Sequence, residues 1–304
     1  MFDIFFVQQL VNGLSVGLIY ALMAIGFTLI FGVLNVVNFA HGEIYMIGSY
    51  AGWLAITIFA PPLLVVILVA MAIGAMAGFG LERIAFWPFR RFRDEASLKS
   101  KAMREATLLS SLAISIIVRE LAEKVFGSNM QTIPQDYLLL TPIQIGPLSF
   151  ASGQFLILGL SIVMLGGLQW LLTRTRVGLS IRAVANNPMG ATYVGINTER
   201  TIIATFVIGS TLGAAAGLVV GLYQGAIFPA MGFAPGVKAF VAMVMGGLSS
   251  IVGAVVCAII LGVAEAVTTS FFAQGWGDLV AYVFLVITLI FFPTGLFGGG
   301  RDRV

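Results

Sequence analysis

The chain is divided into long stretches that contain no charged side chain. These stretches cover residues 4–42, 44–81, 137–173, 201–237, 239–264 and 279–300. Each of them exceeds the ~20 apolar residues that an α-helix needs to cross the hydrocarbon core of a bilayer. The pattern therefore predicts an all-α, polytopic membrane protein.

Interruptions of the apolar pattern predict where individual helices begin and end. We expect helices at residues 8–33, 40–60, 63–86, 105–126, 150–172, 200–224, 253–272 and 277–296, with a shorter apolar segment at 237–248. Pro61 and Pro62 separate the second helix from the third, because proline cannot donate the hydrogen bond that continues a helix. The chain is thus expected to form one domain over residues 1–304, with about eight or nine transmembrane helices, one or two of them short or broken.

Composition supports a membrane protein and excludes several other classes. Hydrophobic residues make up 59% of the 304 residues and charged residues 10%, whereas roughly 25% of a soluble globular domain is charged. Cys257 is the one cysteine and His41 the one histidine, which excludes a disulfide framework, a cysteine cluster and a multi-histidine site. We therefore expect no bound metal. The net charge of +3 is explained by basic loops, so no nucleic-acid partner is expected.

Basic residues gather in two predicted loops, at about residues 87–104 and 173–199. Because cytoplasmic loops carry an excess of lysine and arginine, both loops are expected in the cytoplasm. The loop at about 127–149 has Asp136 as its one charged residue and is expected outside. Arg301 and Arg303 favour a cytoplasmic C-terminus, which requires 237–248 to be a short crossing or a broken helix.

Two segments place polar residues and glycines where the apolar pattern continues on both sides. The first is GVLNVVNFAHGE at residues 32–43, and the second is MGGLSSIVG at residues 245–253. Their candidate functional residues are Asn35, Asn38, His41, Glu43, Gly246 and Gly247. Polar groups at membrane depth are costly and often functional, so the first cluster is a candidate for binding a substrate, forming a gate or relaying protons. The alternative is that its side chains cap a broken helix and satisfy the freed backbone groups.

Other isolated charges in the apolar region have simpler interpretations. Glu265 lies late in the helix at 253–272 and is expected near its outer end. Arg119–Glu123 and Glu120–Lys124 are opposite-charge pairs four residues apart, and are expected on a solvated or interfacial helix face.

Glycine recurs at every fourth residue along one predicted helix. The glycines are Gly209, Gly213, Gly217, Gly221 and Gly225. This spacing forms a smooth stripe on a helix, which lets another backbone approach closely. We expect the stripe to pack within the chain, with a subunit interface as the alternative.

The loop RTRVGLSIRAVANNPMGATYVGINTERT, residues 174–201, is long and mixes basic with apolar residues. Residues 180–194 are expected to form a short helix that carries Arg182, with an interruption at Asn187 and a turn at Gly195. Such a helix suits docking into a groove of a cytoplasmic partner, or alternatively lying on the membrane surface. The sequence has no GxxxxGK[ST] motif, so any ATP is expected to be hydrolysed by another chain.

Three stretches together resemble the branched-chain amino-acid permease family of bacterial ABC importers, in particular its shorter permease subunit. They are GLIYALMAIGFTLIFGVLNVVNFAHGEIYMIGSY, RTRVGLSIRAVANNPMGATYVGIN and GFAPGVKAFVAMVMGGLSSIVGA, in this order along the chain. Importers of urea and short amides resemble them too. The resemblance therefore implies a non-enzymatic permease in the bacterial inner membrane, in contact with lipid, and it indicates the class of substrate less sharply.

The resemblance also implies partners and roles. An external, periplasmic substrate-binding protein would deliver the ligand, a second permease would complete the path, and two cytoplasmic ATPases would hold the ATP and magnesium. The residues implied to couple this chain to an ATPase are Arg182, Ala183, Asn186, Asn187 and Gly195. The two interrupted segments would line or gate the translocation path.

Two other functions stay open at the level of sequence. A proton-coupled secondary transporter would use Glu43 and His41 as a relay and would need no ATPase. A membrane-embedded enzyme is disfavoured, because no convergent set of catalytic residues is visible.

Overall fold

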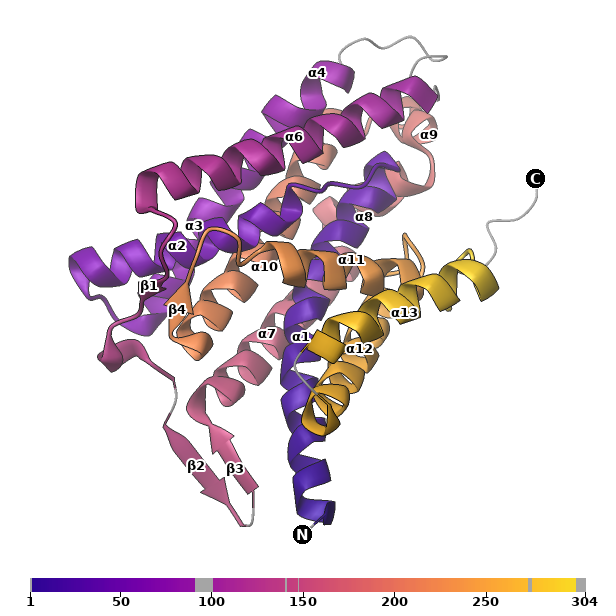
Figure 1. The fold of residues 1–304 in the computed structure, drawn as a ribbon. Coiled ribbons are helices and arrows are strands. Elements are labelled where there is room, and N and C mark those ends of the chain that lie inside the picture. The colour runs from indigo at the N-terminus through magenta and orange to yellow at the C-terminus, as the bar shows by residue number, and fades with distance from the viewer. Residues whose placement is uncertain (1, 91–100, 140, 147, 273–274, 299–304) are drawn as a thin grey trace.

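The computed structural model describes residues 2–90, 101–139, 141–146, 148–272 and 275–298 (Figure 1). Its long helices are α1 (Phe2–Leu34), α2 (His41–Phe59), α3 (Leu63–Leu81), α6 (Lys101–Phe126), α7 (Ser152–Arg174), α10 (Thr198–Gln224), α11 (Phe233–Gly246), α12 (Ile251–Phe271) and α13 (Gly275–Phe291). The shorter helices are a π-helical turn η1 (Glu82–Phe86), α4 (Trp87–Arg90), the 3₁₀ turn η2 (Gln135–Tyr137), α8 (Arg176–Asn186) and α9 (Pro188–Tyr193). The strands are β1 (Gln131–Thr132), β2 (Pro142–Ile145), β3 (Leu148–Ala151) and β4 (Ala226–Ile227).

All of the predicted helices are confirmed, with ends that differ by a few residues. Helix α1 begins at Phe2 rather than at residue 8, and α13 ends at Phe291 rather than at residue 296. Pro293 explains the earlier end, because the residue before a proline is disfavoured in helical conformation and proline itself cannot continue the ladder. Two short antiparallel strand pairs, β1–β4 and β2–β3, were not indicated by the sequence pattern.

Five helices of the described chain are long and apolar enough to cross a membrane. They are Ile4–Leu34, Leu63–Phe89, Ser152–Arg174, Thr198–Gln224 and Ile251–Phe271, and the shorter apolar helices α11 and α13 accompany them. Helices α2 and α6 are present but fall outside this apolar set, since α2 begins with His41 and Glu43 and α6 begins and ends with charged residues. The chain is therefore a multi-pass, predominantly helical membrane protein.

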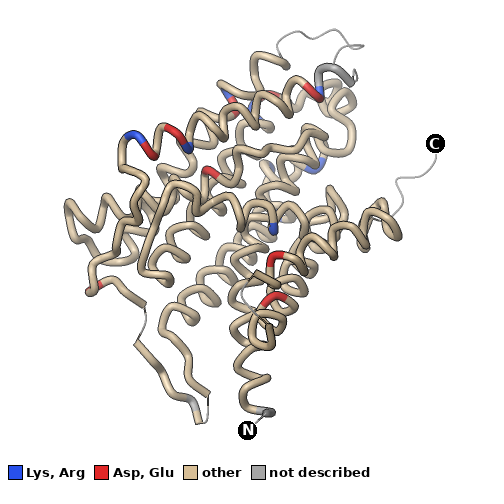
Figure 2. Tube along the Cα trace, viewed as in Figure 1, with Lys and Arg blue, Asp and Glu red and all other residues tan. Residues whose placement is uncertain are grey.

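The two ends of the helical bundle differ in their chemistry. Helix α4, the start of α6 and helix α9 lie at one end, while the N-terminus and the β2–β3 hairpin lie at the other (Figure 1). Charged side chains gather along α6 and at the α9 end (Figure 2). The cytoplasmic and external sides of the loops stay a prediction, and residues 91–100 of the basic loop and the C-terminal arginines lie outside the described residues. The end that carries α9, called the basic end below, is the one predicted to face the cytoplasm.

Helix α10 packs closely against α1 and α2 along its glycine stripe. It meets α3 on another side, where Ala214 and Ser210 lie against Gly74 and Gly78 of α3. Gly209 lies against Gly26 of α1, and Gly217 lies against the backbone carbonyl of Tyr45 in α2. A β-carbon at Gly217 would collide with that carbonyl. The glycines therefore serve contacts within this chain in the structure.

The stripe has four members rather than five. Gly221 still packs, beside the side chain of Ile227. Gly225, in contrast, is the left-handed residue that ends α10, with φ +72° and its N–H donated to the Gly221 carbonyl at 2.9 Å. Its assignment to the packing stripe is corrected accordingly: glycine at this position permits a positive φ at a helix end.

Helices α1 and α12 approach each other in the same way, running antiparallel. Gly13 of α1 lies against the backbone of Val263, and Gly17 lies against that of Ile259. Gly262 contributes from the α12 side. Small residues thus bring backbones together at both of the main contacts of the bundle.

The contact between α10 and α2 yields a test of stability. Gly217→Ala is expected to destabilise the purified protein by about 1–3 kcal/mol, because the added methyl group must displace the α2 backbone. The measurement is thermal unfolding in detergent. Gly159→Ala is the matched control: Gly159 lies in α7 with no neighbouring atom within 4 Å, so alanine there should be neutral or stabilising. Equal stability of the two variants would contradict the close contact.

Candidate functional site

A capped segment of two short helices joins α7 to α10 at the basic end. We call this segment, residues 175–197, the α8–α9 segment. Its first turn is capped by Thr175, whose hydroxyl accepts the Gly178 N–H at 3.1 Å. Asn187 lies between α8 and α9, where its side-chain oxygen accepts the Gly190 N–H at 2.9 Å. Because Ser, Thr and Asn caps satisfy the free N–H groups of a helix start, the segment is well defined locally.

The chain enters α10 from this segment by a sharp turn. Gly195 has φ +85°, a conformation in which glycine carries no side-chain penalty. Asn197 then caps α10 by accepting the Arg200 N–H at 3.0 Å. The interruption at Asn187 and the turn at Gly195 lie where the sequence pattern placed them.

The α8–α9 segment has one buried face and one exposed face. Gly178, Ile181 and Val184 are buried against the bundle. The predicted coupling residues lie on the other side: Arg182, Asn186, Asn187 and Gly195 are exposed and Ala183 is half-buried. The structure therefore places these five residues together at one end of the molecule.

Large apolar side chains accompany the exposed polar residues. Tyr193 is 84% exposed and Val194 is 76% exposed, and Val177, Leu179 and Met189 are exposed as well. Exposed apolar groups rimmed by polar residues mark sites of interaction with a protein or a membrane.

The polar residues of the interrupted segment between α1 and α2 lie in different surroundings. Asn35 is exposed and ends α1 in a left-handed conformation, φ +53°, which asparagine tolerates better than most residues. Asn38 is buried, and its side-chain oxygen accepts the Ala40 N–H at 3.1 Å just before α2 begins. These two residues serve the backbone of the break.

His41 and Glu43 point to different neighbours. The His41 ring is fully buried, 4.8 Å from the ring of Phe27 and beside Gly213. Glu43 is also buried and accepts a hydrogen bond from the Ser115 hydroxyl of α6 at 2.9 Å. The structure thus brings His41 to α1 and α10 but brings Glu43 to α6.

The second interrupted segment lies between α11 and α12, beside the C-terminal turn. Helix α11 ends at Gly246, and Gly247 has φ +101°. The N–H of Leu296 donates to the Met245 carbonyl at 2.7 Å, which satisfies one of the free carbonyls at the end of α11. The first turn of α11, in contrast, lies against the start of α2 through Gly42. The two interrupted segments are therefore not brought together, since about 20 Å of helix separates the ends of α11.

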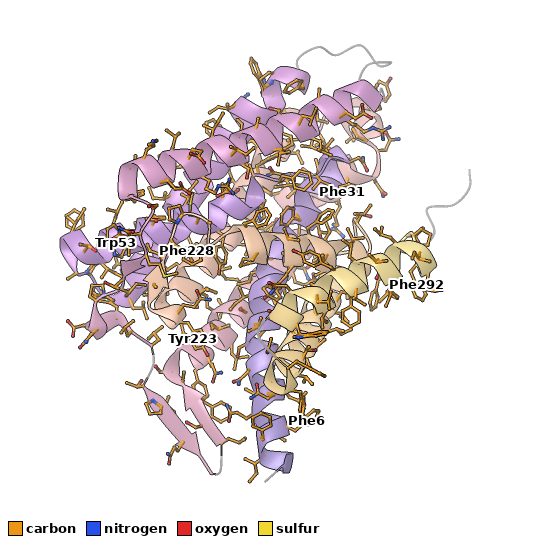
Figure 3. The ribbon with its side chains drawn as sticks, in the orientation of Figure 1. Phe6, Phe31, Trp53, Tyr223, Phe228 and Phe292 are labelled. Carbon is orange, nitrogen blue, oxygen red and sulfur yellow. The ribbon has the colours of Figure 1, made fainter. Side chains whose placement is uncertain are left out.

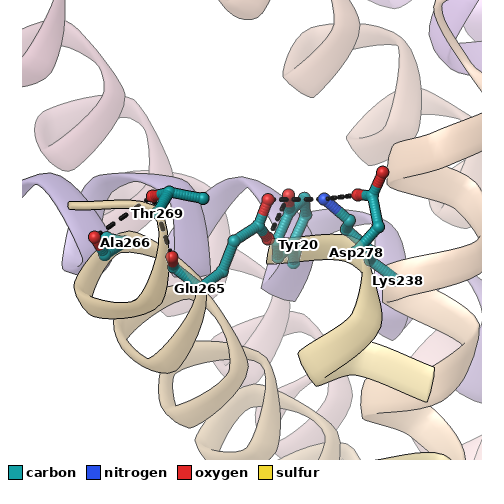
Figure 4. A network of polar contacts seen from close by, with 6 residues as sticks. All are labelled: Tyr20, Lys238, Glu265, Ala266, Thr269 and Asp278. Carbon is teal, nitrogen blue, oxygen red and sulfur yellow. Dashed lines mark hydrogen bonds and ion pairs between the residues drawn. The ribbon is translucent and has the colours of Figure 1, made fainter. Parts of the chain in front are cut away.

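An ion cluster, buried at Lys238 and Glu265, joins α11, α12 and α13 (Figure 4). The Lys238 ammonium of α11 lies 2.5 Å from Oε1 of Glu265 in α12 and 2.7 Å from Oδ1 of Asp278 in α13. The Tyr20 hydroxyl of α1 donates to Oε2 of Glu265 at 2.9 Å. The side chains of Lys238 and Glu265 are 10% and 17% exposed, and that of Asp278 is 56% exposed.

The sequence pattern alone did not predict this cluster. Glu265 was expected late in its helix, and it does lie in the second half of α12. The sequence pattern did not predict that its side chain pairs with Lys238 and Tyr20. The sequence does contain an indication of it: one basic residue, Lys238, and two acidic residues, Glu265 and Asp278, interrupt otherwise uncharged stretches. Ionisable residues inside a membrane bundle pair with one another, so the three interruptions jointly indicate a cluster.

The ion cluster yields a test of its own. Lys238→Met is expected to destabilise the protein by about 3–5 kcal/mol, because it leaves the buried Glu265 carboxylate without its cation. The double variant Lys238→Met/Glu265→Gln should recover part of that loss in thermal unfolding. Lys124→Met, at an exposed position of α6, is the control and should change stability by less than about 0.5 kcal/mol. A Lys238→Met variant as stable as the control would show that the cluster does not hold the helices together.

Known proteins similar to this chain match nearly its whole length. The family profile described as "Branched-chain amino acid transport system / permease component" matches residues 9–289. The high-affinity branched-chain amino acid transport system permease protein BraD of Pseudomonas aeruginosa is 37% identical over 306 residues, which cover 96% of each chain. The corresponding permease protein LivH of Salmonella typhimurium is 34% identical, over 97% of this chain and 96% of its own.

A solved structure, PsaBC from Streptococcus pneumoniae in complex with Fab, aligns over 96% of this chain and 93% of its own. Its TM-score of 0.48 and identity of 14% are too low to support a functional conclusion. The family profile and the two permease relatives extend over the α1–α2 break, the α8–α9 segment and the ion cluster alike. The chain is a multi-pass inner-membrane protein, and it belongs to the family of branched-chain amino acid transport system permease components.

Proposed function

We propose that this chain is the permease subunit of an ATP-binding-cassette importer for branched-chain and related neutral amino acids. The observation that carries the proposal is the α8–α9 segment: a capped, amphipathic pair of helices at the basic end, with Arg182 and large apolar side chains exposed. Within this proposal the segment inserts into a groove of an ATPase subunit, as amphipathic helices do. Arg182, Ala183, Asn186, Asn187 and Gly195 are the residues proposed for that contact.

The way the segment is anchored supports a role in transmitting movement. Ile181 and Val184 are buried. At the two ends of the segment, the Thr175 hydroxyl donates to the Leu171 carbonyl of α7 at 2.7 Å and Asn197 caps α10. A displacement of α8 would therefore act on both helices. Helix α10 in turn contacts α1, α2 and α3, so ATP binding by the partners would reorient helices around the path.

Other chains hydrolyse ATP, complete the translocation path and deliver the ligand. Two cytoplasmic ATPases bind ATP and magnesium and hydrolyse the nucleotide, so this chain is not itself an enzyme and binds no cofactor. A second permease completes the path, and a periplasmic binding protein delivers the amino acid. The relatives named BraD and LivH, described as branched-chain amino acid permease proteins, support this substrate class over urea or short amides.

The placement of His41 and Glu43 argues against a proton-coupled transporter. A direct relay between them needs the two side chains within hydrogen-bond reach of each other or of a common water. His41 faces Phe27 and Gly213, whereas Glu43 faces Ser115 on α6. The pair is therefore better explained by packing and by anchoring of the α1–α2 break.

The proposed contact is tested by co-purification. The tagged chain, isolated from its host in mild detergent, should retain an ATPase pair and a second hydrophobic permease, identified by mass spectrometry. Arg182→Glu is expected to lower ATPase recovery about tenfold, because reversing a charge at the centre of an interface costs at least about 1.4 kcal/mol. Membrane insertion and recovery of the second permease should not change.

Arg176→Glu is the matched control, because Arg176 is exposed at the start of the same helix but outside the proposed contact. Undiminished ATPase recovery with Arg182→Glu would remove Arg182 from the coupling role. A wild-type chain that is isolated without any ATPase would contradict the importer itself.

A further inference from the structure

A polar cavity of about 370 Å³ lies beside the ion cluster, toward the end of the bundle that carries the β2–β3 hairpin. Its walls come from α1, α2, α7, α10, α11 and α12, and its size falls at the lower end of the range for small-molecule sites, about 300–1,000 Å³. Tyr223, on the last turn of α10, contributes to the wall (Figure 3). The cavity therefore lies within this subunit, with a lining drawn from both halves of the chain.

The lining of the cavity carries negative charge only. Among the residues that line the cavity, all of them in the described part of the chain, Glu265 is the one ionisable acid and no lysine or arginine is present. Lys238 contacts Glu265 and Asp278 contacts Lys238, but neither Lys238 nor Asp278 is part of the wall. The cluster of two carboxylates and one ammonium carries one net negative charge, which a bound cation would neutralise.

Glu265 retains capacity to bind such a cation. An ionised carboxylate offers about four lone-pair positions, and the structure uses one oxygen for Lys238 and the other for Tyr20. The aromatic rings of Tyr20, Tyr45 and Tyr223 also line the cavity, and aromatic faces attract ammonium groups.

Tyr45 adds an unpartnered hydroxyl to the wall that contains Glu265. Its side chain is 1% exposed, and its hydroxyl has no hydrogen-bond partner among the described residues although it belongs to the cavity wall. A buried hydroxyl without a partner costs free energy. In a wall that also contains the Glu265 carboxylate, it marks a position where a cationic group fits.

The rest of the wall divides into a polar and an apolar part. Gln9 and Asn12 of α1 bring amide groups, and Asn12 accepts a hydrogen bond from Gln154 at 2.7 Å that fixes its orientation. The apolar part is formed by branched side chains and a proline, namely Val16, Ile19, Ile157, Val220 and Pro235.

We propose that this cavity binds a neutral α-amino acid with an apolar side chain, an inference that rests on the proposed function and names a site for its substrate. The ammonium group lies at Glu265 and the Tyr20 and Tyr45 hydroxyls. The carboxylate meets amide donors of Gln9 and Asn12, and the side chain packs on the branched apolar wall. Lys238 acts as a positioning residue that holds Glu265 toward the cavity.

A second cavity, of about 500 Å³, lies between α2, α3 and α6 and lacks the polar and charged groups that an amino acid needs. Its wall is almost entirely apolar and contains no charged residue, so it has nothing to neutralise either charge of an amino acid. Tyr50 belongs to that wall and, like Tyr45, is buried with an unpartnered hydroxyl. It therefore provides a matched control on the same helix.

Binding of tritiated L-leucine tests the site directly. The full chain, with the partners that purify with it, is placed in lipid nanodiscs without the periplasmic binding protein, and binding is measured by scintillation proximity. Saturable binding is expected, with affinity about two- to tenfold weaker in Tyr45→Phe, because one hydrogen bond to the ligand is lost. Tyr50→Phe should bind leucine like the wild type.

Two analogues test the orientation of the ligand. 3-Methylbutylamine keeps the ammonium and the branched chain and is expected to compete with leucine. 4-Methyl-2-oxopentanoate keeps the carboxylate but lacks the ammonium and is expected to compete at least tenfold more weakly, since an unpaired ligand anion then faces Glu265.

The binding and uptake measurements together distinguish an error in the proposed site from an error in the proposed function. Absence of saturable binding, equal weakening by the Tyr45 and Tyr50 variants, or keto-acid competition as strong as that of the amine would each overturn the site. ATP-driven leucine uptake, measured after the same complex is reconstituted into proteoliposomes with the periplasmic binding protein, would persist if only the site is wrong. Loss of that uptake as well would place the error in the proposed function.

Discussion

Close backbone contact along the glycines of α10 determines where the other parts of this protein lie. The contact lets α10 approach α1 and α2 closely, which a helix with larger side chains at these positions would not do. Glycines of α3 give α10 the same close approach on another side. At about 1.5 Å per residue, α10 extends for about 40 Å. It begins at the Asn197 cap of the α8–α9 segment and ends at Tyr223 and Gly225, beside the polar cavity. One tightly packed helix thus connects the segment proposed to contact an ATPase with the cavity proposed to bind the amino acid.

Charge inside the bundle imposes the second constraint. A lysine or a carboxylate at membrane depth is costly alone, and the structure compensates Lys238 with two carboxylates on neighbouring helices. Because the cluster links α11, α12 and α13 to Tyr20 of α1, it holds the C-terminal helices against the N-terminal one. Glu265 of this cluster also lines the cavity, so the residue that holds the helices together is the one proposed to bind the ammonium group of the ligand.

Much of this architecture follows from the sequence. The helices were predictable because each apolar stretch is long and is ended by a charge, a proline or a glycine, as at Pro61 and Gly225. The α8–α9 segment was predictable in outline from Asn187-Pro188 and Gly195, residues whose backbone preferences act locally. The glycine spacing predicted a packing face, but its last member is a helix end, since a four-residue spacing alone does not show where the helix stops.

The parts that sequence did not reveal depend on contacts between distant segments. Lys238 and Glu265 are 27 residues apart, and nothing local shows that α11 and α12 bring them together. Likewise, the short distance between His41 and Glu43 in sequence indicated a joint role, whereas helical geometry turns the two side chains toward different neighbours. The β2–β3 hairpin was missed because four-residue strands are too short for their alternation to stand out in an apolar chain.

Transport by a reconstituted system tests the central claim, that this chain forms a path driven by ATP hydrolysis in separate subunits. Leucine uptake would be measured in proteoliposomes that contain the chain with its co-purified partners and the periplasmic binding protein, with ATP supplied on the ATPase side. The account predicts uptake that stops when ATP is replaced by a non-hydrolysable analogue and that survives collapse of the proton gradient. Uptake by this chain alone, driven by a proton gradient without ATP, would contradict it.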